Sequence, residues 1–203
     1  MVNVKINGLS AVQGKLIDLP KQIRFAEMQA INDTAKAVQK YELATVLPGN
    51  LTLRGSGWWK PGTRFGINIR PFATKTNLRA VIGSQANWLH YVEEGGIKTA
   101  KGHRLAIEAG ARPSERAVLP RAVKPRRLLG GRKPKGFELK TKSSPAIFIR
   151  EGGTLRLMYM LEPSANVPPT LKFFASGAAY VREIYQQIFD IRLKHAIRTA
   201  KLL

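Results

Sequence analysis

The pattern of apolar and polar positions predicts one long helix near each end of the chain. Apolar residues recur every three or four positions over residues 9–19, which indicates a short helix. Pro20 suits the first turn of a second helix, which the same spacing extends to about Leu47 before Pro48-Gly49-Asn50 ends it. The apolar side of this long helix is predicted to consist of Ile23, Ala26, Ala30, Ile31, Thr34, Ala37, Val38, Tyr41 and Thr45.

The end of the chain, from about Ser176 to Leu203, is predicted to form a second amphipathic helix. His195 falls on the apolar side of this helix, so we expect it to be a partly buried packing residue. The apolar side is predicted to consist of Ala178, Val181, Ile184, Tyr185, Ile188, Ile191 and His195.

A hairpin is predicted over residues 145–161, because two apolar stretches rich in strand-forming residues flank Glu151-Gly152-Gly153. Glycine takes positive φ at no steric cost, so this tripeptide suits the turn. In the second stretch the apolar residues alternate, which places one set on a single sheet face. That set consists of Leu155, Leu157, Tyr159 and Leu161. Strand pairing is expected to stop at the prolines 163, 168 and 169, which cannot donate ladder hydrogen bonds.

Three further strands are predicted by alternation at residues 2–6, 65–69 and 78–83, and the last two are expected to pair antiparallel. Residues 51–63 are expected to form a loop, and residues 87–96 a single helical turn closed by glycine. The whole chain, residues 1–203, is therefore predicted to be one α+β domain. In it, a long N-terminal helix and a long C-terminal helix pack on an antiparallel sheet of about five short strands.

Positive charge is concentrated in residues 98–142, which changes the expectation of a single compact domain for that segment. The chain has 34 Lys and Arg against 13 Asp and Glu, a net charge of +21, which favours a polyanionic or acidic partner. Residues 98–142 hold 14 of the basic residues against three acidic ones, with four prolines, five glycines and no clear periodicity. We expect a basic arm or insertion outside the core. The arm residues expected to bind DNA or a partner are Arg112, Arg116, Arg121, Lys124, Arg126, Arg127, Arg132, Lys133 and Lys135.

Two adjacent tryptophans, Trp58 and Trp59, stand in the predicted loop. They are candidate interface anchors, since tryptophan often carries binding energy at interfaces. Covering one end of the core is the alternative that we favour slightly, and base stacking is a third.

The residue types that carry chemistry are sparse. Cysteine is absent, which excludes disulfides, thiolate zinc sites and a cysteine nucleophile. His90, His103 and His195 lie far apart with no metal-binding spacing, and Glu93-Glu94 is the one acidic pair of note. We therefore expect no enzyme activity, no cofactor and no metal site. No apolar run reaches about 18 residues, so no membrane span is expected, and the start lacks the long apolar core of a signal peptide.

Three segments together resemble phage tail-completion proteins, the group that includes the minor tail protein Z-like family. The first is VKINGLSAVQGKLIDLPKQIRFAEMQAINDTAKAVQ, with a "G-L" and a "L-P" before a long helix. The second is WLHYVEEGG, similar to the family's turn after its hairpin. The third is AIFIREGGTLRLMYMLEPSANVPPTLKFF, followed by a helix. The resemblance covers about two thirds of the chain and excludes residues 98–142.

This resemblance implies a structural virion protein at the head-proximal end of the tail of a tailed bacteriophage. There it would help to close the tail tube and join it to the head connector, as a ring that we expect to be hexameric. The implied partners are copies of itself, the tail terminator or tail tube protein, head connector or adaptor proteins, and virion DNA in the channel, with no membrane. Assembly would take place in the host cytoplasm, and the final location would be the head–tail joint of the virion.

Two other functions remain open. A basic nucleic-acid-binding protein of the ribosomal or RNA-binding type fits the charge, although no RNA-recognition signature is visible. A toxin-like basic nuclease is a third reading, disfavoured because the acidic residues show no spacing that would hold divalent metal.

Overall fold

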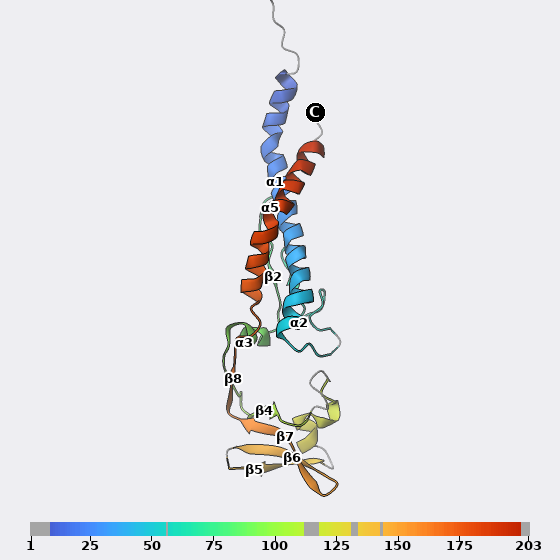
Figure 1. Cartoon of the computed structure of the whole chain (residues 1–203), viewed down its shortest axis with the longest axis vertical. Helices are drawn as coiled ribbons and strands as arrows, with labels where there is room; N and C mark the ends of the chain where they lie inside the picture. Colours follow the sequence, from blue (N-terminus) through green and yellow to red (C-terminus); the bar gives the residue numbers. More distant parts are fainter. Residues whose placement is uncertain (1–8, 56, 112–117, 131–133, 143, 200–203) are drawn as a thin grey trace, which may run out of the picture. The chain divides into compact units, whose positions relative to one another are not determined.

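The computed structural model describes residues 9–55, 57–111, 118–130, 134–142 and 144–199. The chain folds into two compact units, each built from more than one stretch of sequence (Figure 1). The first unit takes the described residues of Met1–Val46, Trp59–Gln85 and Phe173–Leu203, and the second takes those of Leu47–Trp58 and Ala86–Lys172. The mixed α+β class, the long helices near both ends of the chain and the antiparallel pairing of strands are confirmed. The strand predicted at residues 2–6 lies outside the described residues.

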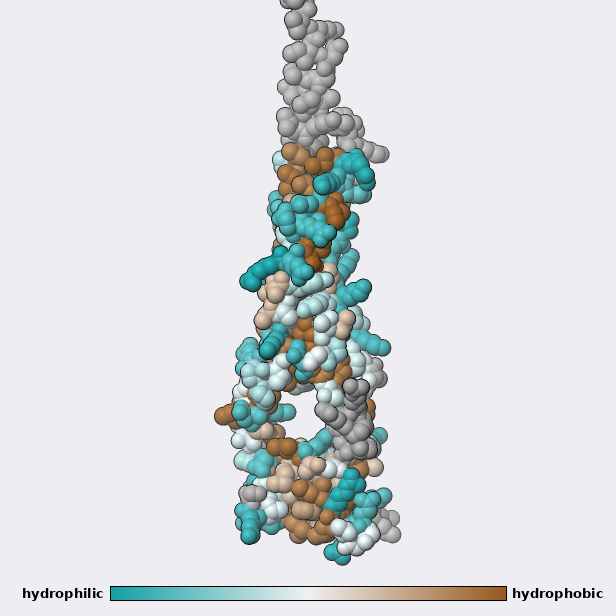
Figure 2. Space-filling view, in the orientation of Figure 1, coloured by the Kyte–Doolittle hydropathy of each residue, from teal (hydrophilic) through white to brown (hydrophobic). Residues whose placement is uncertain are grey.

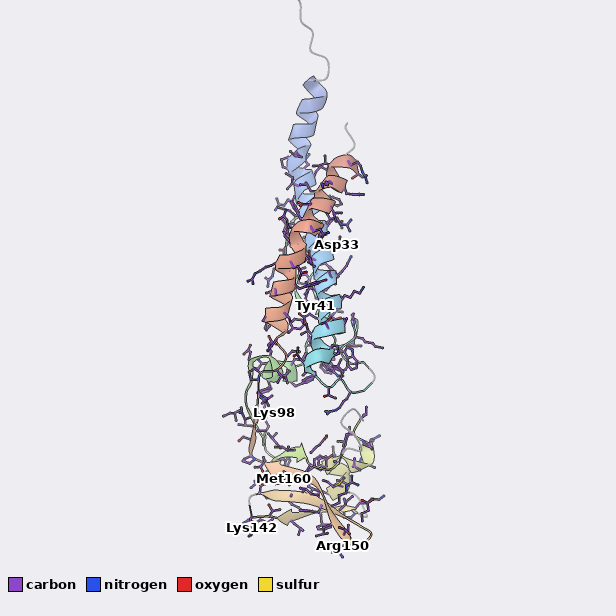
Figure 3. All side chains as sticks on the ribbon, viewed as in Figure 1. Asp33, Tyr41, Lys98, Lys142, Arg150 and Met160 are labelled. Atoms are coloured by element: carbon purple, nitrogen blue, oxygen red, sulfur yellow. The ribbon has the colours of Figure 1, made fainter. Side chains whose placement is uncertain are left out.

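The first unit is built on two long helices that lie side by side, α1 (Leu9–Tyr41) and α5 (Phe173–Thr199) (Figure 1). Ala26 and Ala30 are fully buried, so the side of α1 that packs is made of small side chains that permit a close helix contact. Asp33, labelled in Figure 3, pairs with Arg192 and joins α1 to α5. Burial raises the pKa of Tyr185 on α5, and the nearby carboxylate of Glu27 on α1 raises it further.

The N-terminal helical region differs from its prediction at two points. α1 runs through Pro20, where a new helix was predicted. The fixed φ of proline is compatible with a helix, although the residue costs α1 one backbone hydrogen bond. Beyond α1 the chain forms a π-helical turn, η1 (Glu42–Val46), and then α2 (Leu47–Asn50), so the helical region does end at Pro48-Gly49-Asn50. The π-turn's hydrogen bonds span one residue more, so Val46 is buried where Thr45 was expected.

The predicted apolar side of α5 is partly wrong. His195 is exposed, and the neighbouring Ala196 is buried in its place. Ile191, expected on the packed side, is 58% exposed. At 3.6 residues per turn, the buried Gly177 and Ala196 point about 100° apart around the axis, so they lie at the two edges of a broad packed side.

A short antiparallel pair, β1 (Asn68–Ile69) and β2 (Ile82–Gly83), completes the first unit. The pairing of the two predicted segments is confirmed, but each strand is shorter than the alternation suggested. The side-chain amide of Asn32 on α1 donates to the carbonyl of Ala73 at 3.0 Å and accepts from its N–H at 2.8 Å. These bonds fix the connection between the two strands against α1.

The second unit contains a four-stranded antiparallel sheet. Its strands are β4 (Leu105–Glu108), β5 (Gly136–Lys140), β6 (Pro145–Glu151) and β7 (Thr154–Glu162), in the order β4-β7-β6-β5. The predicted hairpin is β6 and β7, and its turn glycines Gly152 and Gly153 have φ of 58° and 83°, as the turn requires. The helical turn is also confirmed as α3 (Trp88–Glu94), closed by Gly95 with φ 75°.

A second small sheet was not predicted. β3 (Gly96–Thr99) pairs antiparallel with β8 (Ser164–Val167). Pairing in the larger sheet does stop before Pro163, and β8 ends immediately before Pro168, as expected for residues without an N–H. The prediction missed β8, the four residues between Pro163 and Pro168, which pair with β3. In the described residues the strands form three sheets, where one sheet of about five strands was expected.

The described part of residues 98–142, expected as an arm outside the core, includes several regular elements. β4 pairs with β7 and β5 pairs with β6, so two strands from this segment form the edges of the larger sheet. A short 3-10 helix, η2 (Arg121–Val123), leads into α4 (Pro125–Leu129). Leu128 on α4 is 2% exposed and belongs to the sheet's apolar core.

Candidate functional site

A β-bulge in β7 decides which side chains lie on each face of the four-stranded sheet. Tyr159 pairs with Ile147, but Leu157 pairs with the next residue, Phe148, so Met158 is the extra residue in β7. An extra residue reverses the alternation, which places Tyr159 and Leu161 on one face and Leu155 and Leu157 on the other. The prediction that these four residues share a face is therefore wrong.

One face of the sheet is covered. Leu128 of α4 packs with Ile147, Tyr159 and Leu161 in a buried core. The Tyr159 hydroxyl donates to the carbonyl of Val123 at 2.8 Å, which ties η2 to β7. The loop and helix that carry the basic residues 121–127 are thus held on this face.

The opposite face is apolar and partly exposed, with Ala146 buried within it. Ile107 pairs with Met160 across two strands. Phe148 pairs with Phe137 on one side and with Leu157 on the other. We call this surface the open sheet face, and it consists of Ile107, Phe137, Leu139, Phe148, Leu155, Leu157 and Met160. Ile107, Leu139 and Leu155 are 40%, 40% and 46% exposed. Apolar residues gather at the sheet in Figure 2, and Figure 3 marks Met160 and Arg150 on its hairpin. Such a surface is typical of an interaction site.

The predicted arm residues are only partly described. Arg121, Lys124, Arg126, Arg127 and Lys135 are all exposed, and they lie on η2, at the start of and within α4, and just before β5. The structure therefore brings four of these basic residues, all but Lys135, to the segment that covers the sheet's buried face. Arg112, Arg116, Arg132 and Lys133 lie outside the described residues.

Trp58 and Trp59 are both half-buried. The ring of Trp58 lies edge-on to Trp88 of α3, with a centroid distance of 4.6 Å. Trp88 is the more exposed of this pair, at 42%. Trp58 therefore packs within its own unit.

A second basic surface, which the sequence pattern did not indicate, lies in the first unit. We call residues 60–85 the acid-free loop, because the sequence has no Asp or Glu between Glu42 and Glu93. Its basic side chains are all exposed, namely Lys60, Arg64, Arg70, Lys75 and Arg79. The signal that could have identified it is the absence of acidic residues, which is less conspicuous than the dense charge of residues 98–142.

The acid-free loop encloses a surface cavity of about 340 Å³. Two arginines, Arg64 and Arg70, line it together with Thr63, Asn68, Ser84 and Gln85. The Asn68 amide donates to the carbonyls of Thr63 and Gly66 at 3.0 and 3.1 Å, and the Ser84 hydroxyl donates to Phe65 at 2.6 Å. These uncharged groups shape the loop, while the guanidinium groups supply its charge.

Groups that could perform catalysis are not assembled in the described residues. These residues contain no group of three or more His, Asp or Glu side chains able to hold a metal ion. His90 pairs with Glu94 one turn along α3, at 3.3 Å, and both side chains are well exposed.

The described helices include none that is long and apolar enough to cross a membrane. In comparisons with protein-family models, curated proteins and solved structures, nothing matched the chain.

Proposed function

We propose that this protein is a structural subunit of a tailed bacteriophage, a tail-completion protein at the head-proximal end of the tail. Copies of the chain form a ring around the DNA channel, and the ring closes the tail tube and joins it to the head connector. The sequence resemblance described above motivates this role. The observation that carries it is the open sheet face, a large apolar surface on a chain with net charge +21.

The occupant that we propose for the open sheet face is a second copy of the chain. A ring forms when one surface of a subunit meets a different surface of the next subunit, and the rotation closes. The complementary surface that we propose lies near the start of α5. It is formed by Phe174 and Val181, which are 67% and 36% exposed and project within about 20° of each other around the helix axis.

The response to salt distinguishes self-association of the chain from its binding to a polyanion. Copies that each carry +21 repel one another, and added salt screens this repulsion while it leaves the apolar contact in place. Association of copies is therefore expected to strengthen with salt. Binding to DNA is expected to weaken, because phosphate contacts release counterions.

The experiment is analytical ultracentrifugation at about 50 mM and 500 mM salt, ionic strengths at which screening lengths differ severalfold. We expect a closed oligomer that persists at the higher salt, and we expect Leu155→Glu to convert it to monomer. Val118→Glu is the matched control, since Val118 is 60% exposed and lies outside the sheet. A wild-type chain that stays monomeric at both salts, alone and with tail tube protein, would overturn the proposal.

A nucleic-acid-binding protein of the ribosomal or RNA-binding type is the second candidate. The exposed basic residues of η2 and α4 favour it. RNA that remains bound through purification, together with a salt-independent monomer, would support this candidate over the tail role.

A further inference from the structure

We propose that the acid-free loop is a nucleic-acid-binding site, in which Arg64 and Arg70 hold the phosphate backbone. This site lies in the first unit, apart in sequence from the basic segment 98–142. The proposal rests on the loop's own charges and geometry, and it does not depend on a role in a phage tail.

Charge is the first argument. Five basic side chains are exposed along the loop, and the sequence offers no acidic residue from 43 to 92 to neutralise them. Among the described residues, none of the five forms an ion pair with a carboxylate. A surface of this kind attracts anions and raises their local concentration.

The cavity gives this charge a defined position. Both arginines line the cavity. Arg64 lies in the turn that leads into β1, and Arg70 directly follows the end of that strand. A guanidinium group presents its N–H donors in a planar fork that matches two oxygens of a phosphate. The hydrogen bonds made by Asn68 and Ser84 within the loop fix its shape before any ligand arrives.

The loop is also anchored to α1. Asn32 makes its two hydrogen bonds to Ala73, and the Gln39 side-chain amide donates to the carbonyl of Ile67 at 2.7 Å. A Cβ at Gly66 would lie 2.0 Å from the Lys60 carbonyl oxygen, so this tight turn requires glycine. A loop held in place in this way loses little conformational entropy on binding.

Two exposed aromatic rings favour nucleic acid over an acidic protein as the ligand. Phe65 and Phe72 are 43% and 46% exposed; Phe65 directly follows Arg64, and Phe72 stands two positions after Arg70. The guanidinium carbon of Arg64 lies 5.3 Å from the centroid of the Phe65 ring. Basic residues interleaved with exposed aromatic rings bind a phosphate backbone and stack on its bases.

The test is the affinity of the full chain for fluorescent single-stranded and duplex DNA, measured by anisotropy over a salt series. We expect Arg64→Gln with Arg70→Gln to weaken binding about tenfold or more at 0.1 M salt, because two phosphate contacts are lost. On duplex DNA the slope of log K against log salt should become shallower by about 1.8. Lysine at both positions should restore the slope. The control is Arg182→Gln with Lys194→Gln, which removes two exposed charges from α5 in the same unit.

Two outcomes overturn the proposal. The first is a loop variant whose affinity and salt slope equal those of the α5 control. The second is a loop variant that loses binding to polyglutamate as strongly as binding to DNA, which would identify an acidic protein as the ligand. DNA should also protect Arg64 and Arg70 of the wild-type chain from modification by phenylglyoxal, a measurement that needs no variant. Loss of tail assembly leaves this proposal intact, since the two experiments probe different surfaces.

Discussion

Asn32 offers the sharpest test of how the acid-free loop is held. Its side chain makes two hydrogen bonds to the backbone of Ala73, across 41 positions of sequence. Replacing Asn32 by alanine removes both bonds and leaves the partly buried N–H and carbonyl of Ala73 without the amide. A hydrogen bond of this kind contributes about 1 kcal/mol, so we expect a loss of about 2 kcal/mol in the free energy that closes the loop on α1.

The measurement is hydrogen exchange of the backbone amides in residues 67–82. If the loop opens locally, a loss of about 2 kcal/mol raises its exchange rates about 30-fold. Amides in the four-stranded sheet of the second unit serve as the internal control, and their exchange should not change. The same variant should weaken DNA binding, because Arg70 then lacks a fixed position.

Asn32→Asp is the matched variant. The carboxylate accepts a hydrogen bond from the Ala73 N–H but cannot donate to its carbonyl, so one bond is lost and a repulsion between oxygens is added. Protonation of the introduced carboxyl restores a donor, so the exchange rate of the loop relative to that of the wild type at the same pH should fall as the pH drops through the carboxyl's pKa. Wild-type exchange rates in both variants would refute the reasoning that this amide anchors the loop.

Two other predictions concern the helix pair and the basic segment. A Cβ at Gly177 would lie 3.1 Å from Oε1 of Glu42 and 3.7 Å from Val38, so Gly177→Ala should stay within about 1 kcal/mol of the wild type, since crowding offsets its better helix propensity. Gly177→Leu should lower the free energy of unfolding by about 1–3 kcal/mol in urea denaturation, and equal stability of both variants would contradict the close helix contact. If the basic segment contacts DNA, replacing four of its residues by glutamine should flatten the salt dependence of binding, whereas an unchanged slope would remove that contact from the model. These residues are Arg126, Arg127, Arg132 and Lys133.

Elements defined by local signals could be predicted from the sequence. The turn of the hairpin follows from Gly152 and Gly153, and the long helices follow from their apolar spacing. Departures from regular geometry could not be predicted, because they depend on partners far along the chain. The bulge at Met158 is fixed by the register between β6 and β7, and it alone decides which face Leu155 joins.

The candidate surfaces were predictable to different degrees. A dense run of basic residues directs attention to residues 98–142, and the exposed Arg126 and Arg127 lie within it. The cavity with Arg64 and Arg70 forms because Asn68 and Ser84 bend the loop around it, which periodicity does not reveal. The open sheet face was hidden for a similar reason, since β4 and β5 come from a segment without clear alternation.

The pairing of α1 with α5 has a consequence for synthesis on the ribosome. α1 ends at Tyr41 and its partner begins at Phe173, so the two halves of the helix contact are separated by most of the chain. At about 5–20 residues per second, roughly 7–26 s pass between the end of α1 and the start of its partner, with the apolar side of α1 uncovered. Residues 86–172 are complete before α5 is made, so the second unit can close first. The nascent chain therefore presents an amphipathic helix that a chaperone or another copy of α1 can bind before α5 arrives.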